Sequence, residues 1–295
     1  MKIARFEAEE ETHLGIVDGD EVIDLNVLNR SVPNELAELL RRLDGDLGYI
    51  AELAKRATSR SRRPIEGLRY ALPVAGTSKI ICLGLNYLEH LKEGLLRHTS
   101  PQHPTVFMRL ISSIVPHEQP IVRPMASVQF DFEAELVAVV GRRAKHMTLD
   151  NALSCIAGYS CCNEGSVRDF QRHTSQWGMG KNFDRSGSIG PWVVTDDELP
   201  SGARNLKIQS RLNGQIMQSD TTSSMMFPLA EIIVYLTKGI ELEPGDLIVT
   251  GTPSGVGAAR KPDPVWMKDG DKFEVEIEGI GVLCNPIIDE RPSVT

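Results

Sequence analysis

The chain has 295 residues, a formal net charge of −8 at pH 7, and 41% hydrophobic and 24% charged residues. Its length allows one large domain or a small domain joined to a larger one, and its composition is that of a globular protein. The negative charge argues against nucleic acid as a partner, and no run approaches the roughly 20 apolar residues of a membrane span. The N-terminus, MKIARFEAEEE, turns acidic where a signal peptide would be apolar, so we expect a cytoplasmic protein.

The five cysteines give no metal-binding or disulfide pattern. None is spaced as C-x-x-C, and all stand in apolar contexts, so we expect reduced and buried thiols. They are Cys82, Cys155, Cys161, Cys162 and Cys284. Cys161 and Cys162 are adjacent in a predicted strand and point to opposite faces, which argues against a shared metal.

The beginning of the chain predicts a small α/β domain. Residues 2–25 alternate between apolar and polar side chains around an Asp18-Gly19-Asp20 turn, which is typical of a β-hairpin unit. Apolar residues with helical spacing then occupy residues 34–43 and 47–55. The polar, basic stretch 57–64 predicts a solvated surface linker.

We place the domain boundary after residue 70, between domains of residues 1–70 and 71–295. The larger part is strand-rich, without regular βαβ alternation, which indicates an α+β fold. Its predicted strands cover residues 79–83, 106–110, 130–140, 159–163, 191–194, 206–212, 216–218, 247–250, 273–277 and 282–285. Its predicted helices cover residues 88–96, 148–156, 166–173 and 227–238. The polar, proline-flanked stretch 97–104 predicts a mobile segment.

Two carboxylates on one predicted strand are the first sign of a site. Glu133 and Glu135 lie two residues apart, so their side chains point to the same face. The opposite face is apolar, which predicts a buried strand whose carboxylates line a cavity. Neighbouring carboxylates repel unless a cation, a proton or a salt bridge lies between them, and a hard divalent cation suits oxygen ligands. The alternative for this pattern alone is an exposed face of an edge strand.

Several stretches together resemble the fumarylacetoacetate hydrolase family. They are GLNYLEH (84–90), DFEAELVAVVGR (131–142), AGYSCCNEGSVRDFQ (157–171), GKNFDRSGSIGPW (180–192), LEPGDLIVTGTPSGVG (242–257) and the closing GDKFEVEIEGIGVLCNP, with the Asn213-Gly214 hairpin signal between them. They occur in the family's order over roughly residues 75 to 290, which is more specific than any single motif. The resemblance implies a mixed β-sandwich roll preceded by a small N-terminal α/β domain, and a homodimer.

The resemblance also implies a metal centre. Glu133 and Glu135 match two of the family's metal ligands, and Glu164 stands where the family usually has the Asp of an Asn-Asp pair. The extra methylene of Glu164 is expected to shift its oxygen or the backbone. Three carboxylates suit Mg²⁺ or Mn²⁺, with Ca²⁺ possible. The alternative for Glu164 is a salt bridge to Arg168, one helical turn away.

A general base is implied in the same way. His90 and Glu93 match the family's H-x-x-E dyad, and one helical turn places them on the same face. Glu93 would hold the imidazole while His90 takes a proton from water. We expect this dyad to form only when its segment closes over the substrate. Without the resemblance, a lone histidine here would be structural.

Further residues match the family's substrate contacts, namely Arg168, Gln171, Lys181 and Thr252. Arg168 can pair with a carboxylate in a planar fork, and Lys181 offers a point charge to an enolate oxygen. Arg109 stands where many relatives have Lys. We hypothesise that it binds a distal substrate carboxylate; the alternative is a surface arginine.

The resemblance therefore predicts a metal-dependent hydrolase that cleaves a C–C bond of an acylpyruvate. The substrate would be a 2,4-dioxo acid such as maleylpyruvate or fumarylpyruvate from aromatic catabolism, and the products pyruvate and a carboxylic acid. The alternatives on the same fold are an oxaloacetate decarboxylase and a 2-hydroxyhepta-2,4-diene-1,7-dioate isomerase. A non-catalytic metal-binding protein is the third possibility. The expected partners are a small oxo acid and a second copy of the chain, with neither nucleic acid nor a membrane.

Overall fold

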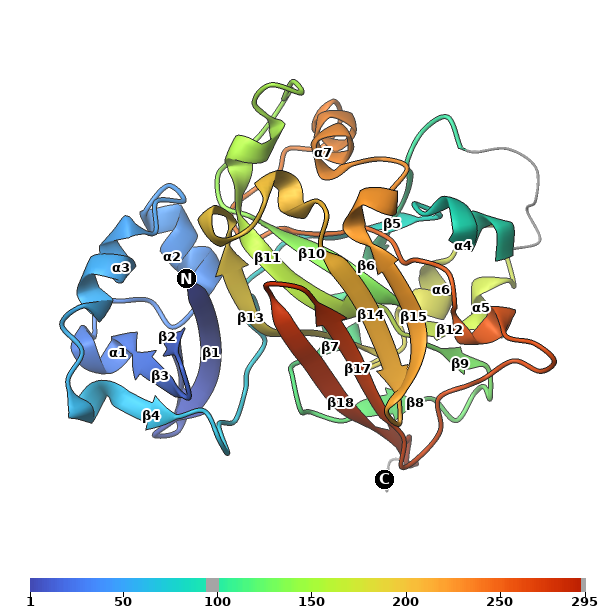
Figure 1. Ribbon diagram of the computed structural model, residues 1–295, viewed down its shortest axis with the longest axis horizontal. Helices are drawn as coiled ribbons and strands as arrows, with labels where there is room; N and C mark the ends of the chain where they lie inside the picture. The colour runs from blue at the N-terminus through green and yellow to red at the C-terminus, as the bar shows by residue number, and fades with distance from the viewer. Residues whose placement is uncertain (94–100, 293–295) are drawn as a thin grey trace.

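The computed structural model describes residues 1–93 and 101–292, and its framework is an eleven-stranded mixed sheet (Figure 1). Across this sheet the strands follow the order β4 (Arg62–Pro64), β3 (Glu21–Asp24), β2 (Glu11–Asp18), β1 (Lys2–Ala8), β13 (Gly187–Thr195), β11 (Ile156–Asn163), β10 (Ala134–Val140), β16 (Leu247–Val249), β5 (Ile80–Gly84) and β6 (Thr105–Arg109). The eleventh strand, β7 (Ile114–Val115), pairs with β13 outside this order. The predicted strand-rich α+β fold is confirmed.

A five-stranded sheet packs against the middle of the large one. Its order is β15 (Gln215–Thr221), β14 (Lys207–Leu212), β17 (Lys272–Ile277), β18 (Gly281–Asp289) and β8 (Ile121–Arg123). The two sheets bury a shared core in which Leu136 and Ala138 of β10 join Val275 of β17, all with 0% exposure. The predicted hairpin is confirmed: Asn213 and Gly214 both have positive φ, 51° and 81°, as a type I′ turn between β14 and β15 requires.

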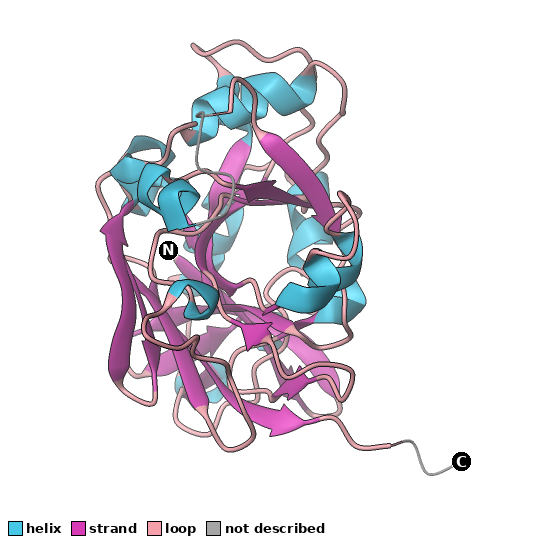
Figure 2. Ribbon diagram, turned by 90° about the vertical axis from the view of Figure 1, so that its right-hand side faces the viewer, coloured by secondary structure: helices cyan, strands magenta, loops and turns pink. Residues whose placement is uncertain are grey.

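Short helices cover the other surfaces. They are α1 (Leu25–Leu28), α2 (Leu36–Arg42), α3 (Gly48–Ala54), α4 (Leu88–Glu93), α5 (Arg168–Gln171), α6 (Gly178–Lys181) and α7 (Leu229–Thr237). α2 and α3 pack on the second face of the large sheet, where Leu36 and Leu40 share a buried cluster with Val137 and Val139 of β10. α4, α5 and α6 gather at the end of the molecule opposite the N-terminal strands, the end that faces the viewer in Figure 2.

The N-terminal strands do not form a sheet of their own. β1 pairs antiparallel with β13, with Lys2 opposite Val194, so the large sheet continues from the first residues into the core. The predicted linker over residues 57–64 is wrong, because its end forms β4 and pairs with β3. Carboxylates of the β2–β3 hairpin fix this strand: Arg62 lies 2.9 Å from Asp18 and 3.0 Å from Glu21.

The single strand predicted over residues 130–140 is also corrected. β9 (Phe130–Asp131) pairs with β12 (Ser166–Val167), whereas β10 pairs with β11, so the backbone leaves the ladder at Phe132 and Glu133. Residues 97–100 of the predicted mobile segment and residues 94–96 of the predicted helix lie outside the described residues.

All five cysteines are free thiols, and four of them are buried, as predicted, whereas Cys284 is half-buried. Cys161 and Cys162 belong to different core clusters on the two sides of the large sheet, which confirms that they point apart. Within residues 1–93 and 101–292, no helix has the length and apolar character to cross a membrane.

Candidate active site

Three carboxylates meet at the start of β10. Oxygen atoms of Glu133, Glu135 and Glu164 all lie within 4.8 Å of one another, and the residues are 3%, 1% and 1% exposed. The break in the strand creates this arrangement. Glu133 donates its backbone N–H to Asn163 Oδ1 at 3.1 Å, and Glu164 donates its own to the Glu133 carbonyl at 2.8 Å. The start of β10 is thereby tied to the turn that follows β11.

Lys181 joins two of these carboxylates. Its Nζ lies 2.5 Å from Glu133 Oε2 and 2.8 Å from Glu164 Oε2. The lysine ends α6, which approaches α5 so closely that a Cβ on Gly180 would lie 2.4 Å from the Gln171 nitrogen. The glycine in the sequence GMGK therefore permits the contact that carries Lys181 into the site.

Arg168 reaches the same cluster from α5. Its Nε lies 2.7 Å from Asp131 Oδ2, its Nη2 lies 2.7 Å from Glu133 Oε1, and its Nη1 donates to Gln171 Oε1 at 2.9 Å. The alternative of a Glu164–Arg168 salt bridge is wrong, because Glu164 pairs with Lys181. The prediction that Arg168 and Gln171 share a helix face is confirmed.

Charges decide the pKa values of the cluster. Burial alone would raise the pKa of Glu133, but Arg168 and Lys181 outweigh it and hold that pKa well below its ordinary value. Burial, together with the charges of Glu164 and Glu133, raises the pKa of Glu135. Burial raises the pKa of Glu164 as well, and Lys181 offsets only part of this effect.

The donor set fits a hard divalent cation. Glu164 Oε1 is buried and makes no hydrogen bond, whereas Glu135 Oε2 accepts one from the Gly251 N–H at 2.6 Å. Three buried carboxylates share the positive charge of Lys181 and part of that of Arg168, so negative charge remains to be compensated. Glu133, Glu135 and Glu164 would hold the ion, and their oxygens suit Mg²⁺ or Mn²⁺.

His90 and Glu93 form the predicted pair. His90 Nδ1 lies 3.0 Å from Glu93 Oε2, and Glu93 Oε1 accepts the Gly255 N–H at 2.7 Å. The pair is already formed in this structure, so the expectation that it assembles only on closure is corrected. The backbone of the glycine-rich bend holds Glu93 in place for His90.

Thr252 lies at this site with its hydroxyl engaged by protein groups. The hydroxyl donates to the Ala134 carbonyl at 2.9 Å and accepts from Gln218 Nε2 at 2.8 Å. Gln218 in turn accepts the Ala134 N–H at 3.0 Å. In the described structure, Thr252 therefore fixes the start of β10.

Arg109 does not lie where either reading of the sequence placed it. It is 3% exposed, so the surface-arginine alternative is wrong. Its guanidinium donates to Ser113, to the Gly165 carbonyl and to Ser186, so protein groups occupy the donors that a distal substrate carboxylate would need. The structure therefore gives no support to the hypothesis that Arg109 binds substrate.

Three supporting residues carried no predicted role. Asp131 accepts the N–H groups of Gly257 and Ala258 and pairs with Arg168, which links the glycine-rich bend to α5. Asn86 bonds the carbonyls of Phe227 and Thr250, and Gln218 holds β10. Asp131 and Asn86 stand inside the quoted motifs, which is the only signal that could have found them.

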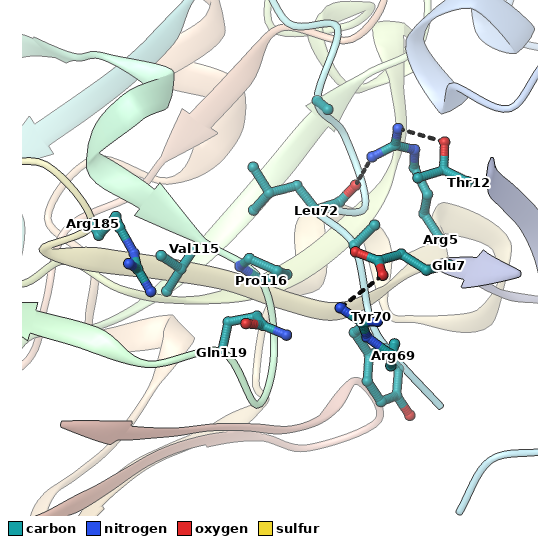
Figure 3. Close-up of a pocket in the computed structure, with 12 residues that line it drawn as sticks. Arg5, Glu7, Thr12, Arg69, Tyr70, Leu72, Val115, Pro116, Gln119 and Arg185 are labelled. Atoms are coloured by element: carbon teal, nitrogen blue, oxygen red, sulfur yellow. Dashed lines mark hydrogen bonds and ion pairs between the residues drawn. The ribbon is translucent and has the colours of Figure 1, made fainter. Parts of the chain in front are cut away.

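A separate cavity of about 450 Å³ lies between the N-terminal strands and the core (Figure 3). Its Arg5 donates to the Asn34 carbonyl and to Thr12, and its Arg69 pairs with Glu7 at 3.0 Å. None of the three clustered carboxylates lines it.

Comparisons with known proteins show which family this chain resembles. The family model of the fumarylacetoacetate hydrolase C-terminal domain matches residues 79–288. Oxaloacetate tautomerase Fahd2a of Rattus norvegicus is 36% identical over 98% of this chain and 92% of its own length. The solved fumarylacetoacetate hydrolase of Exiguobacterium antarcticum is 32% identical, covers 98% of this chain and 100% of its own, and superimposes with a TM-score of 0.83.

Maleylpyruvate hydrolase of Sphingobium sp. SYK-6, solved with manganese(II) and pyruvate, is 26% identical over 99% of this chain and 100% of its own, with a TM-score of 0.80. The chain belongs to the fumarylacetoacetate hydrolase family. Enzymes of this family with hydrolase, isomerase and tautomerase activities are among its relatives and structural neighbours.

Proposed function

We propose that this protein catalyses the divalent-metal-dependent enol–keto tautomerisation of a short dicarboxylic 2-oxo acid, with oxaloacetate as the first substrate to test. The observation that carries the proposal is the Lys181 ammonium group between Glu133 and Glu164, with His90 near enough to help lower the pKa of Glu133. A cation beside an acid–base group is what a reaction through an enolate needs. The similarity to the rat oxaloacetate tautomerase over 98% of the chain supports this choice of substrate.

The cation, when bound, would act as a Lewis acid that polarises the 2-oxo group and neutralises charge on its oxygen. Lys181 donates a hydrogen bond to the oxygen that becomes negative when the enol hydroxyl loses its proton. Arg168 Nη2 pairs with Glu133 Oε1 at 2.7 Å, so its guanidinium adds positive charge beside the carboxylate cluster, where an anionic substrate would lie.

The proton transfer is assigned to His90. Glu93 accepts the Nδ1–H of His90, which leaves Nε2 for the substrate. In the enol-to-keto direction, His90 Nε2 accepts the hydroxyl proton, the O–H electron pair forms the oxo group as the C=C bond breaks, and the resulting imidazolium delivers the proton to the carbon next to the oxo group. The two steps balance, and neither requires a water molecule as nucleophile.

The test is an ultraviolet assay of enol-oxaloacetate decay with metal-free protein, followed by added Mg²⁺ or Mn²⁺. We expect metal-dependent acceleration of the decay, without release of pyruvate or CO₂, and loss of that acceleration in His90→Ala. Stoichiometric CO₂ and pyruvate would show a decarboxylase instead. A decay rate equal to that of buffer with metal alone would reject the proposal.

A second candidate is the C–C hydrolysis of an acylpyruvate from aromatic catabolism. The structural likeness to maleylpyruvate hydrolase and the preformed His90–Glu93 pair, which could activate water, favour it. The hydrolase also needs an enolate of pyruvate, so the same lysine would serve. One pyruvate released per maleylpyruvate or fumarylpyruvate would select this activity.

We also propose a homodimer that covers the exposed edge of the large sheet. Met108, Leu110 and Ile111 at the end of β6 are 42%, 60% and 41% exposed, and Met179 of α6 is 65% exposed. Asn182 bonds the β6 end to the segment after α6, which brings these apolar side chains to one region. Light scattering after size exclusion tests this, and a monomer at micromolar concentration would reject it.

A further inference from the structure

A buried arginine stands behind the carboxylate cluster. Arg109 ends β6, and its guanidinium bonds three segments of the chain. Nε donates to Ser113 Oγ at 3.1 Å, Nη1 donates to the Gly165 carbonyl at 3.1 Å, and Nη2 donates to Ser186 Oγ at 2.8 Å and to the Ser113 carbonyl at 3.4 Å. Such a fully engaged guanidinium acts as a fixed joint between backbone segments.

One of these bonds holds the residue next to a carboxylate ligand. Gly165 follows Glu164, whose own N–H donates to the Glu133 carbonyl at 2.8 Å. A Cβ on Gly165 would lie 1.8 Å from the Ser186 carbonyl oxygen, so the two segments are in close contact. The Glu164 backbone is thus fixed on one side by Glu133 and on the other by Arg109.

The same end of β6 also holds the lysine of the site. Asn182, directly after Lys181, accepts the Leu110 N–H at 2.6 Å and donates to the Met108 carbonyl at 3.1 Å. Arg109 stands between these two residues. The β6 end therefore connects the two segments that deliver Glu164 and Lys181 to each other.

We propose that Arg109 is a positioning residue that orients the Glu164 carboxylate toward a divalent cation. This deepens the proposed metal-dependent function and rests on it. A lysine at this position carries all its donors on one nitrogen, whereas the guanidinium places Nε, Nη1 and Nη2 at Ser113, Gly165 and Ser186 separately. Without the guanidinium, the Gly165 carbonyl and the Ser186 hydroxyl lose buried partners, and Glu164 is free to turn away from the other two carboxylates.

The experiment measures Mn²⁺ binding to the full-length, metal-free chain by calorimetry and by the electron paramagnetic resonance of free Mn²⁺. We expect Arg109→Lys and Arg109→Gln to weaken Mn²⁺ binding about 10- to 100-fold, as loss of outer contacts to metal ligands does. With saturating Mn²⁺, the KM for the oxo acid should stay close to that of the unchanged protein, because Arg109 does not touch substrate.

The exposed Arg172 next to α5 supplies a matched control, and Arg172→Gln should leave Mn²⁺ binding unchanged. Ser186→Ala removes a single partner of Arg109 and should weaken Mn²⁺ binding in the same direction by a smaller factor. This variant decides the question if both Arg109 variants fail to fold, as judged by circular dichroism. Unchanged Mn²⁺ binding in Ser186→Ala would then overturn the proposal.

Two other results would overturn it directly. If Arg109→Lys bound Mn²⁺ normally but had a tenfold higher KM for the oxo acid, Arg109 would be a substrate-binding residue instead. Absence of Mn²⁺ binding to the unchanged protein would remove the metal site itself. By contrast, tight Mn²⁺ binding without tautomerase activity would reject the proposed reaction, and the Mn²⁺ affinities would still measure the role of Arg109.

Discussion

Glu93 accepts the backbone N–H of Gly255 at 2.7 Å, which ties helix α4 to the glycine-rich bend after β16. Gly255 has φ of 104°, and a Cβ there would lie 2.3 Å from the Met217 carbonyl oxygen, so only glycine fits. The other oxygen of Glu93 contacts His90 Nδ1 at 3.0 Å. The orientation of the histidine therefore depends on a bend far away in the sequence.

Replacement of Glu93 by Gln tests this link. The amide oxygen can still accept the Gly255 N–H, but the neutral group no longer stabilises a protonated imidazole. We expect kcat to fall about 100-fold, within the range for general acid–base groups, with little change in thermal stability. Steady-state kinetics and a thermal melt measure the two effects. A normal kcat would mean that Glu93 only holds α4.

Removal of the Lys181 charge should make stability depend on metal. Lys181→Met leaves Glu133 and Glu164 buried without their shared cation, which costs about 3–5 kcal/mol in comparable pairs. A bound divalent ion replaces part of that charge. We therefore expect Mn²⁺ to raise the Tm of Lys181→Met more than that of the unchanged protein, with the exposed Lys238→Met as control. Equal Tm shifts in all three would contradict this account.

Glu164→Gln should affect stability and metal binding in opposite directions. Burial raises the pKa of Glu164, which shows that its charged form is held at a cost. A neutral amide removes like-charge repulsion from Glu133 and Glu135, so the metal-free protein should gain about 1 kcal/mol. Mn²⁺ affinity should fall because one anionic ligand is lost. Urea unfolding and calorimetry measure the two quantities, and a loss of both would show that Glu164 is needed mainly as the partner of Lys181.

Acid should destabilise the protein through His117. Burial, aided by the charge of Lys272, lowers the pKa of His117 to about 4, and its Nδ1 accepts the Cys284 N–H at 3.0 Å. Between pH 6.5 and about 4 the unfolded chain binds a proton that the folded chain does not, so stability falls as the pH falls. The loss is up to about 3 kcal/mol. His117→Asn keeps an acceptor but does not titrate, so its urea midpoint should change less between pH 7 and pH 4.5.

An equal loss of stability in acid for the unchanged protein and for His117→Asn would contradict this prediction. Glu118 lies 3.7 Å from His117 Nε2, and the ring of Tyr70 packs edge-on against it at 4.7 Å. If the protonated imidazole gained enough from Glu118, the unchanged protein and His117→Asn would lose stability equally in acid. Equal slopes would then assign the acid sensitivity to other groups.

The sequence predicted many of the elements correctly. The linker over residues 57–64 and the helix over residues 148–156 are wrong, because Arg62–Pro64 form β4 and only Ala152–Cys155 form a 3₁₀ turn before β11. The Asn-Gly pair at residues 213–214, the alternation in residues 2–25 and the apolar run after Glu135 each predict local structure from short-range rules, and the structure has these elements. The motif order also determined the family, because its spacing depends on the whole catalytic part of the chain. Glu133, Glu135 and Glu164 could be named for the same reason.

The tertiary structure decided what those residues contact. Arg62 becomes part of a strand because its backbone pairs with β3, far earlier in the chain, and no local rule carries that information. Likewise, the sequence offered Glu164 a partner one turn away in Arg168, whereas packing of α6 placed Lys181 there instead. Long-range packing also decides what the Arg109 side chain contacts. Its guanidinium bonds Ser113, Gly165 and Ser186 because the fold brings these three segments together around it. The sequence alone does not show which segments come together.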